Sequence, residues 1–316
     1  FCSSYIFWTV GIGAVPTVLN AGLAHLIRSE GYSGQASFGV AFGGILNMVL
    51  DPIFIFLFKL EITGAAIATM LSNVAATVFF LAFLLKIRKE TTITPSLKYF
   101  TVRNGIPLEV TTVGLPSFVM TLMSTVSNLT LNKMISGYSN EAVAGMGIAK
   151  KIDLMAFAIA QGMTQGTLPL IGYNYSSGNR KRMMSALKVL LVDCLVVAIV
   201  GMALMFFGAT PITRCFIDDA VTVEYGRNFL QIVCLACPTT ALNFLAITIF
   251  QATGKKTQPL ILSLLRKGGL DIPLMFLFNG IIGISGIAWA TPLADVLALI
   301  VSLILTVPYL KKLISE

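Results

Sequence analysis

Charged side chains are scarce in this sequence. They make up 11% of its 316 residues, whereas hydrophobic residues make up 56%. The mean hydropathy of +0.86 lies far outside the range of soluble globular domains. These values exclude a soluble protein, so we expect a polytopic membrane protein that contacts the lipid bilayer.

Histidine and cysteine are also rare, with one His and five Cys in the chain. Cys234 and Cys237 form a Cys-x-x-Cys pair, but a structural zinc site needs four ligands. We therefore predict no metal site and no cofactor. A membrane-embedded enzyme would need a clustered nucleophile and base or metal ligands. We predict that the protein is not an enzyme, and keep such an enzyme as the alternative from a different class.

Apolar runs of about twenty residues, long enough to cross a bilayer as helices, recur along the chain. The nine runs lie near 4–27, 36–58, 62–85, 108–131, 142–171, 186–209, 228–252, 258–279 and 284–309. The chain begins with Phe1 inside the first run, without a signal-peptide pattern. We interpret it as a fragment that lacks its N-terminus.

Basic residues are distributed on alternate loops, which explains the net charge of +8 without a nucleic-acid partner. One set of loops holds sixteen Lys and Arg residues, at positions 28, 86–103, 180–188, 255–267 and 311–312. The opposite set holds four: Lys59, Lys133, Arg214 and Arg227. The positive-inside rule places the richer set and the C-terminus in the cytosol.

Asp51 is the only charged side chain between Ala36 and Phe58. An acid inside a membrane span is a functional-site hypothesis by default. Asn47 lies one helical turn earlier on the same face, and Pro52 removes a backbone donor, which frees carbonyls beside the carboxylate. The alternative is an Asp that only satisfies a Pro-kinked turn.

The span near 108–131 carries a polar stripe, because Ser117, Thr121, Ser124 and Asn128 recur at intervals of four, three and four. Such a stripe either lines a cavity or forms hydrogen bonds between helices. Methionines concentrate in this span and the next, and Met adapts to ligands of varied shape. The predicted cavity suits amphipathic cations or aromatic molecules. Its candidate residues are Ser117, Thr121, Ser124, Asn128, Met120, Met155, Gln161 and Asn243.

Early segments recur about 220 residues later in the chain. Leu50-Asp51 recurs as Leu270-Asp271, and the run that starts at Ile62 recurs from Ile284. Both copies begin on the same side of the membrane, which makes a parallel repeat and two lobes. A complete duplication needs roughly 115 more residues upstream, or three spans. We therefore predict an all-α fold of two six-helix lobes, with the N-lobe truncated to three helices.

The corresponding boundaries are 1–88 for the truncated N-lobe, 89–105 for a cytosolic inter-lobe linker and 106–316 for the C-lobe. The linker is rich in Lys, Arg and Thr and contains Pro95.

Several motifs closely resemble those of the multidrug and toxic compound extrusion (MATE) transporters. They are the helix break 26–31, Asn47-x-x-x-Asp51-Pro52, the run 64–69, the segment 169–179 with its Gly-Tyr-Asn-Tyr core, and Phe250-Gln251-Ala252-x-Gly254. The resemblance runs through the whole chain. It implies a twelve-span fold, of which this chain looks like spans four to twelve.

The resemblance also implies a cation site in the N-lobe, formed by Asn47, Asp51 and Thr69, with H⁺ or Na⁺ as the coupling ion. Asp271 matches Asp51 in the sequence repeat, but the residue four positions before Asp271 is Lys267 and not an Asn. The ion-binding pair is therefore not duplicated. Some members use acids on spans seven and ten, and neither 117–128 nor 238–251 carries one here. Asp271 and Asp295 are secondary candidates.

The resemblance implies a monomeric antiporter of the plasma membrane that exports drugs and toxic compounds by alternating access. A lipid-linked oligosaccharide flippase of the same superfamily is the nearest alternative. It would need several cavity-facing Arg or Lys residues to hold a pyrophosphate, and only Lys150 and Lys151 qualify in the sequence.

The predicted orientation can be checked by labelling single cysteines in intact cells. Cysteines placed near Lys59, Lys133 and Arg214 should react with an impermeant reagent from outside. Those near Arg88, Arg180 and Lys255 should react only after permeabilisation, because the basic loops stay in the cytosol. The reverse pattern would reject this orientation.

Overall fold

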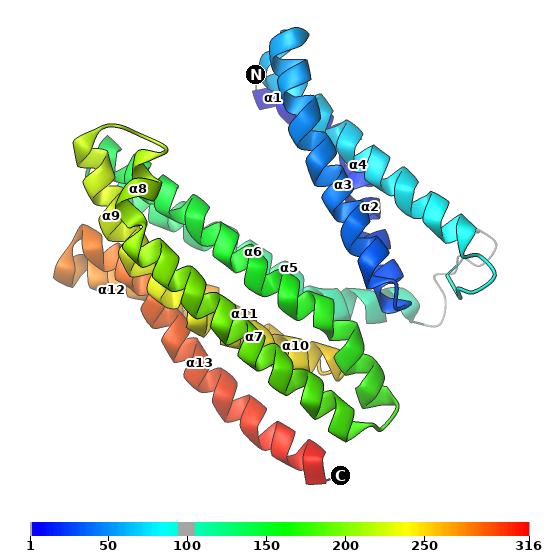
Figure 1. Cartoon of the computed structure of the whole chain (residues 1–316). Helices are drawn as coiled ribbons and strands as arrows, with labels where there is room; N and C mark the ends of the chain where they lie inside the picture. Colours follow the sequence, from blue (N-terminus) through cyan, green and yellow to red (C-terminus); the bar gives the residue numbers. More distant parts are fainter. Residues whose placement is uncertain (1, 94–104, 316) are drawn as a thin grey trace. The chain divides into compact units, whose positions relative to one another are not determined.

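The computed structural model describes residues 2–93 and 105–315, which are almost entirely helical and contain no strand. The chain forms two compact units, Phe1–Thr101 and Val102–Glu316. Figure 1 shows the helices of both units.

The first unit is built on α4, which packs against both α2 and α3. Its elements are α1 (Cys2–Ile6), the π-helical η1 (Phe7–Ile12), α2 (Ala14–Ser29), α3 (Ser33–Pro52), the π-helical η2 (Ile53–Leu57) and α4 (Glu61–Lys86). Ala24, Ile27, Phe80 and Leu84 are buried between these helices. A Cβ at Gly39 would collide with the Phe80 ring, so this glycine allows α3 and α4 to approach closely.

The second unit contains the long helices α6, α7 and α13 (Figure 1), and α10 packs against all three of them. Its elements are α5 (Ile106–Ile135), α6 (Asn140–Ser176), α7 (Arg180–Phe207), α8 (Ala209–Arg214), α9 (Ala220–Val233), the 3₁₀ turn η4 (Cys234–Ala236), α10 (Cys237–Ala252), α11 (Thr257–Leu264), the π-helical η5 (Leu265–Asp271), α12 (Ile272–Ile282) and α13 (Ile284–Ser315). Three apolar clusters of buried residues lie in it. Met146, Phe229 and Ile287 belong to the first, Ile171, Leu187 and Phe244 to the second, and Ile247, Phe250 and Leu262 to the third.

Side-chain caps begin three of these helices. Ser139, Asn179 and Asp219 accept hydrogen bonds from backbone amides in the first turns of α6, α7 and α9, which satisfies donors that have no partner inside the helix. Asp219 lies in the loop before α9 and accepts from both the hydroxyl and the amide of Thr222. These bonds hold the pKa of Asp219 below its ordinary value.

The sequence repeat has local structural counterparts in the two units. Gly31 follows α2 and Gly254 follows α10, both with positive φ, a conformation that glycine adopts without strain. Gly64 on α4 and Gly286 on α13 are a second matched pair. A Cβ at Gly64 would meet the Phe54 carbonyl group, and one at Gly286 would meet that of Phe278.

Six helices of the described residues are long and apolar enough to cross a membrane. They span Ser33–Leu57, Glu61–Lys86, Ile106–Ile135, Arg180–Phe207, Ala220–Ala252 and Ile284–Leu313. A seventh is added if the pair Ser3–Ile12 and Ala14–Ser29, bent by 47°, counts as one span. Two predicted runs are not among them. Helix α6 carries Lys150, Lys151 and Asp153, and the run near 258–279 is broken into α11, η5 and α12.

Two of the basic residues assigned to a cytosolic loop do not lie in a loop. Arg266 and Lys267 are part of η5, in the interior of the second unit, and Arg266 is 3% exposed. The number of Lys and Arg residues in the loops of that side therefore falls from sixteen to fourteen, against four on the opposite side. The direction of the charge bias is unchanged.

Helices α6 and α9 cross where two glycines meet, and this contact predicts a steric effect. A Cβ at Gly145 would lie 2.8 Å from the backbone nitrogen of Gly226. Gly145→Ala should therefore force the helices apart and destabilise the protein by about 1–3 kcal/mol. Fluorescence-detected thermal unfolding in detergent would measure this as a lower Tm.

Gly147→Ala is the matched control, because no atom lies within 4 Å of a Cβ at Gly147 on the same helix. An equal effect of the two substitutions would contradict the steric explanation.

Candidate functional site

The first unit brings Asn47, Asp51 and Thr69 together. Asn47 and Asp51 lie one turn apart on α3, and the Asn47 amide Nδ2 is 3.3 Å from Asp51 Oδ1. The same Nδ2 is 3.4 Å from Thr69 Oγ1 on α4. Each residue is partly buried. The amide of Asn47 therefore links a carboxylate and a hydroxyl from two helices.

A chain of hydrogen bonds holds this cluster in place. The Thr69 hydroxyl donates to the Ala65 carbonyl at 2.9 Å, and the Asn73 amide donates to the Thr69 carbonyl at 3.0 Å. Asn20 on α2 donates to Asn73 Oδ1 at 2.9 Å. The position of Thr69 is thus tied to all three long helices of the unit.

The helix break beside Asp51 follows from its sequence. Pro52 has no amide hydrogen, and the π-helical η2 begins directly after it. Gly64 at the start of α4 then allows contact with the backbone of Phe54 in η2. This contact brings α4, and with it Thr69, against the end of α3.

The second unit has a different arrangement at the matched position. Lys267 Nζ lies 3.3 Å from Asp271 Oδ2, one turn apart on η5. Ser127 of α5 donates to the same oxygen at 2.6 Å. Asp271 is 1% exposed, and its Oδ1 has no hydrogen-bond partner among the described residues. An ammonium group thus stands where the first unit has the amide of Asn47.

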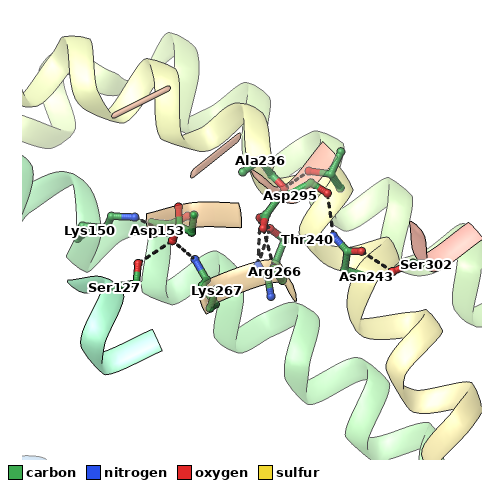
Figure 2. Close-up of polar contacts among 12 residues, drawn as sticks. Ser127, Lys150, Asp153, Ala236, Thr240, Asn243, Arg266, Lys267, Asp295 and Ser302 are labelled. Carbon is green, nitrogen blue, oxygen red and sulfur yellow. Dashed lines mark hydrogen bonds and ion pairs between the residues drawn. The ribbon is translucent and has the colours of Figure 1, made fainter. Parts of the chain in front are cut away.

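Asp295 belongs to a fully buried ion-pair network, shown in Figure 2. Arg266 Nε lies 2.6 Å from Asp295 Oδ1 and Nη2 lies 3.0 Å from Oδ2, so the pair is bidentate. The Thr240 hydroxyl donates to Oδ2 at 2.5 Å. Both carboxylate oxygens of Asp295 are therefore already bonded within the protein.

Asn243 is part of the same network, not of a cavity wall. Its amide donates to the Asp295 backbone carbonyl at 3.0 Å, and it accepts from Ser302 at 2.9 Å. Thr291 lies one turn before Asp295 and is also buried, but its hydroxyl has no partner in the described part of the chain.

A cavity of about 780 Å³ lies within the second unit. Of the predicted cavity residues, Ser124, Asn128 and Met155 line it. Ser117 and Thr121 are exposed on α5 but lie outside the lining, as does the half-buried Gln161. Met120 packs against the buried cluster that contains Phe244. The polar stripe of α5 therefore reaches the cavity only at its C-terminal half.

The sequence reasoning missed Thr240, Arg266, Lys267 and Thr291 as cavity-lining residues. Arg266 and Lys267 lie inside the apolar run 258–279. This position could have predicted their place in the cavity lining, because charged residues within a span face a protein interior or a cavity.

Cys234 and Cys237 are buried and unoxidised at the junction of η4 and α10. Within residues 2–93 and 105–315, no three side chains of His, Cys, Asp and Glu come together as a possible metal site.

The family model described as MatE matches residues 116–277 of this chain. The chain belongs to the MATE family. Multidrug export protein MepA of Staphylococcus saprophyticus is 32% identical over 283 residues, which are 90% of this chain and 62% of that protein. MepA of Staphylococcus aureus strain NCTC 8325 is 29% identical over 260 residues, 82% of this chain and 57% of the relative. The chain thus spans less than two thirds of the length of these relatives.

Solved structures agree in fold. An outward-facing conformation of a multidrug resistance MATE family transporter of the MOP superfamily aligns with a TM-score of 0.90 at 24% identity. A MATE crystal structure in the straight conformation aligns with a TM-score of 0.89 at 23% identity. Each alignment covers 99% of this chain and 70% of the other. At these identities the similarity concerns the fold alone.

The network around Asp295 predicts a specific stability pattern. Arg266→Met should destabilise the protein by about 3–5 kcal/mol, because it leaves a buried carboxylate without its counter-charge. Arg266→Met combined with Asp295→Leu should restore most of the loss, because no buried charge then remains. Chemical or thermal unfolding in detergent measures both.

Arg227→Met is the control, since Arg227 is an exposed arginine on α9. A double variant that is no more stable than the single Arg266→Met variant would argue against the ion pair as the cause.

Proposed function

We propose that the protein is a secondary antiporter that exports amphipathic drugs and other toxic compounds in exchange for H⁺ or Na⁺. Membership of the MATE family and the export names of its MepA relatives support the efflux part. The cluster of Asn47, Asp51 and Thr69 is the observation that carries the coupling part.

The cluster offers the hard oxygen ligands that suit a proton or a sodium ion. Its internal hydrogen bonds use the amide hydrogens of Asn47 and one carboxylate oxygen, Asp51 Oδ1. Asp51 Oδ2 and the amide oxygen of Asn47 have no partner among the described residues, so both remain available to an ion. No resident cofactor is part of this proposal.

The mechanism follows from the cost of keeping a carboxylate in an apolar span. A bound H⁺ or Na⁺ neutralises Asp51 and removes most of that cost. The helix break at Pro52 and η2 is the local hinge that can respond to this change. A cation that binds one lobe arrangement better than the other shifts the population toward it, which is alternating access.

Several further parts of the proposal concern architecture. We propose twelve spans in two six-helix lobes, of which this chain supplies nine spans, with boundaries at 1–88, 89–105 and 106–316. The 62% coverage of a MepA relative is consistent with this proportion. We also propose a monomer in the plasma membrane with a cytosolic C-terminus.

A lipid-linked oligosaccharide flippase is the second candidate, because Lys150, Lys151, Arg266 and Lys267 all line the cavity. Three of these four cations contact carboxylates of the same unit, however. The cavity volume of about 780 Å³ is in the range of drug sites. Drug export therefore remains the better-supported proposal, and no observation favours a membrane-embedded enzyme.

In the full-length protein, Asp51→Asn should abolish gradient-driven efflux without lowering membrane abundance. The neutral amide keeps the shape of the side chain but cannot alternate between a charged and a neutralised state. Asn47→Ala and Thr69→Ala should weaken efflux less, since each removes one neutral ligand. Dye efflux in everted vesicles with an imposed H⁺ or Na⁺ gradient measures the effect.

Glu61→Gln is the matched control, because Glu61 is an exposed acid at the start of α4. Efflux at the normal rate in Asp51→Asn would eliminate this cluster as the coupling site.

A further inference from the structure

The cavity of the second unit has a positive lining. Four basic residues and two acidic residues line it: Lys150, Lys151, Arg266, Lys267, Asp153 and Asp295. In a cavity of low polarity, a surplus of one sign raises the local concentration of the opposite charge. The lining itself has two more basic than acidic residues, and Asp271, which contacts Lys267 from outside the lining, reduces this surplus to one.

Three of the cations contact an acid within the unit. Arg266 is paired with Asp295 at 2.6 Å, Lys267 with Asp271 at 3.3 Å, and Lys150 approaches Asp153 at 3.8 Å. Figure 2 shows Lys150 with Asp153 and Arg266 with Asp295, together with the side chain of Lys267.

Lys151 differs from the other three cations. Its side chain is exposed, lines the cavity, and has no hydrogen-bond or ion-pair partner among the described residues. The cavity wall therefore contains one ammonium group that the protein does not neutralise.

The rest of the lining is mostly apolar and indicates what the uncharged part of a ligand would be. Met155, Phe157, Ile159, Met163 and Met205 form an apolar wall that can accept aromatic or aliphatic groups. Ser124 and Asn128 of α5 add hydroxyl and amide groups. A cavity of about 780 Å³ is in the range that accommodates a drug-sized molecule.

We propose that this cavity binds amphipathic molecules that carry a carboxylate, including zwitterions, and that Lys151 binds the carboxylate. This assignment departs from the amphipathic cations expected from the sequence. This inference rests on the proposed function in one respect, since it takes the cavity as the drug-binding site. It concerns the charge of the ligand and does not depend on the coupling ion.

Rhodamine B and its ethyl ester form a suitable pair of probes, because they share one aromatic body and differ in a single carboxylate. Binding of each dye to the purified protein in lipid nanodiscs can be followed by fluorescence anisotropy without an ion gradient. Rhodamine B should bind roughly tenfold or more tightly than the ester, as expected for one charge-assisted contact. Lys151→Gln should remove this difference, Lys151→Arg should preserve it, and Lys151→Glu should reverse it.

Lys133→Gln is the control, since Lys133 lies on α5 outside the cavity lining. Equal affinity of the wild-type protein for the two dyes, no saturable binding of rhodamine B, or a Lys151→Gln variant that keeps the preference would each overturn the proposal. Tm values near that of the wild-type protein exclude unfolding as the cause of any loss. Asp51→Asn should leave the dye preference intact, so a failure of the coupling hypothesis is recognised separately.

Discussion

The ion pair between Arg266 and Asp295 is the contact on which the second unit depends, because neither charge can be buried without the other. It joins η5 to α13, and Thr240 extends it to α10. Once this pair forms, a π-helical turn with two adjacent cations can occupy the interior of an apolar bundle. The neighbouring Lys267 is then placed beside Asp271, and both basic side chains reach the cavity. The charge of the cavity wall is thus a consequence of the pairing behind it.

Each unit has a polar residue four positions before an aspartate, but the two pairs differ in charge. In the first, Asn47 gives Asp51 a dipole, which leaves the carboxylate a net charge that an external ion can neutralise. In the second, Lys267 gives Asp271 a full counter-charge that is covalently attached to the chain. A mobile cation has less to gain at Asp271 than at Asp51, because an ammonium group already lies beside Asp271. This asymmetry is the physical reason for placing the proposed coupling site at Asp51 and not at Asp271.

The sequence could predict the cluster of Asn47, Asp51 and Thr69. Helical spacing places Asn47 and Asp51 on one face, and the family resemblance adds Thr69. The pairing of Arg266 with Asp295 was beyond sequence reasoning, since that contact joins residues 29 positions apart through a π-helical turn. Periodicity counts treat such a turn as ordinary helix and misplace every side chain after it. The polar stripe of α5 predicted the cavity lining only in part, since Ser124 and Asn128 line the cavity and Ser117 and Thr121 do not. Periodicity predicts a common face for Ser117 and Asn128, but neighbouring helices decide where along that face a cavity begins.

Helix geometry helps to explain why Lys151 is the one basic residue of the cavity lining that has no acidic partner within the described residues. On α6, Asp153 follows Lys150 by three residues, so the two side chains lie on the same face and meet. Lys151 is two residues from Asp153 and points about 100° away from Lys150. No acid stands three or four residues from Lys151 in either direction, since Gly147, Ile148, Leu154 and Met155 occupy those positions. Spacing along α6 therefore gives Lys151 no acidic partner on its own helix, and the cavity beside it places the ammonium group where the proposed ligand can supply a negative charge.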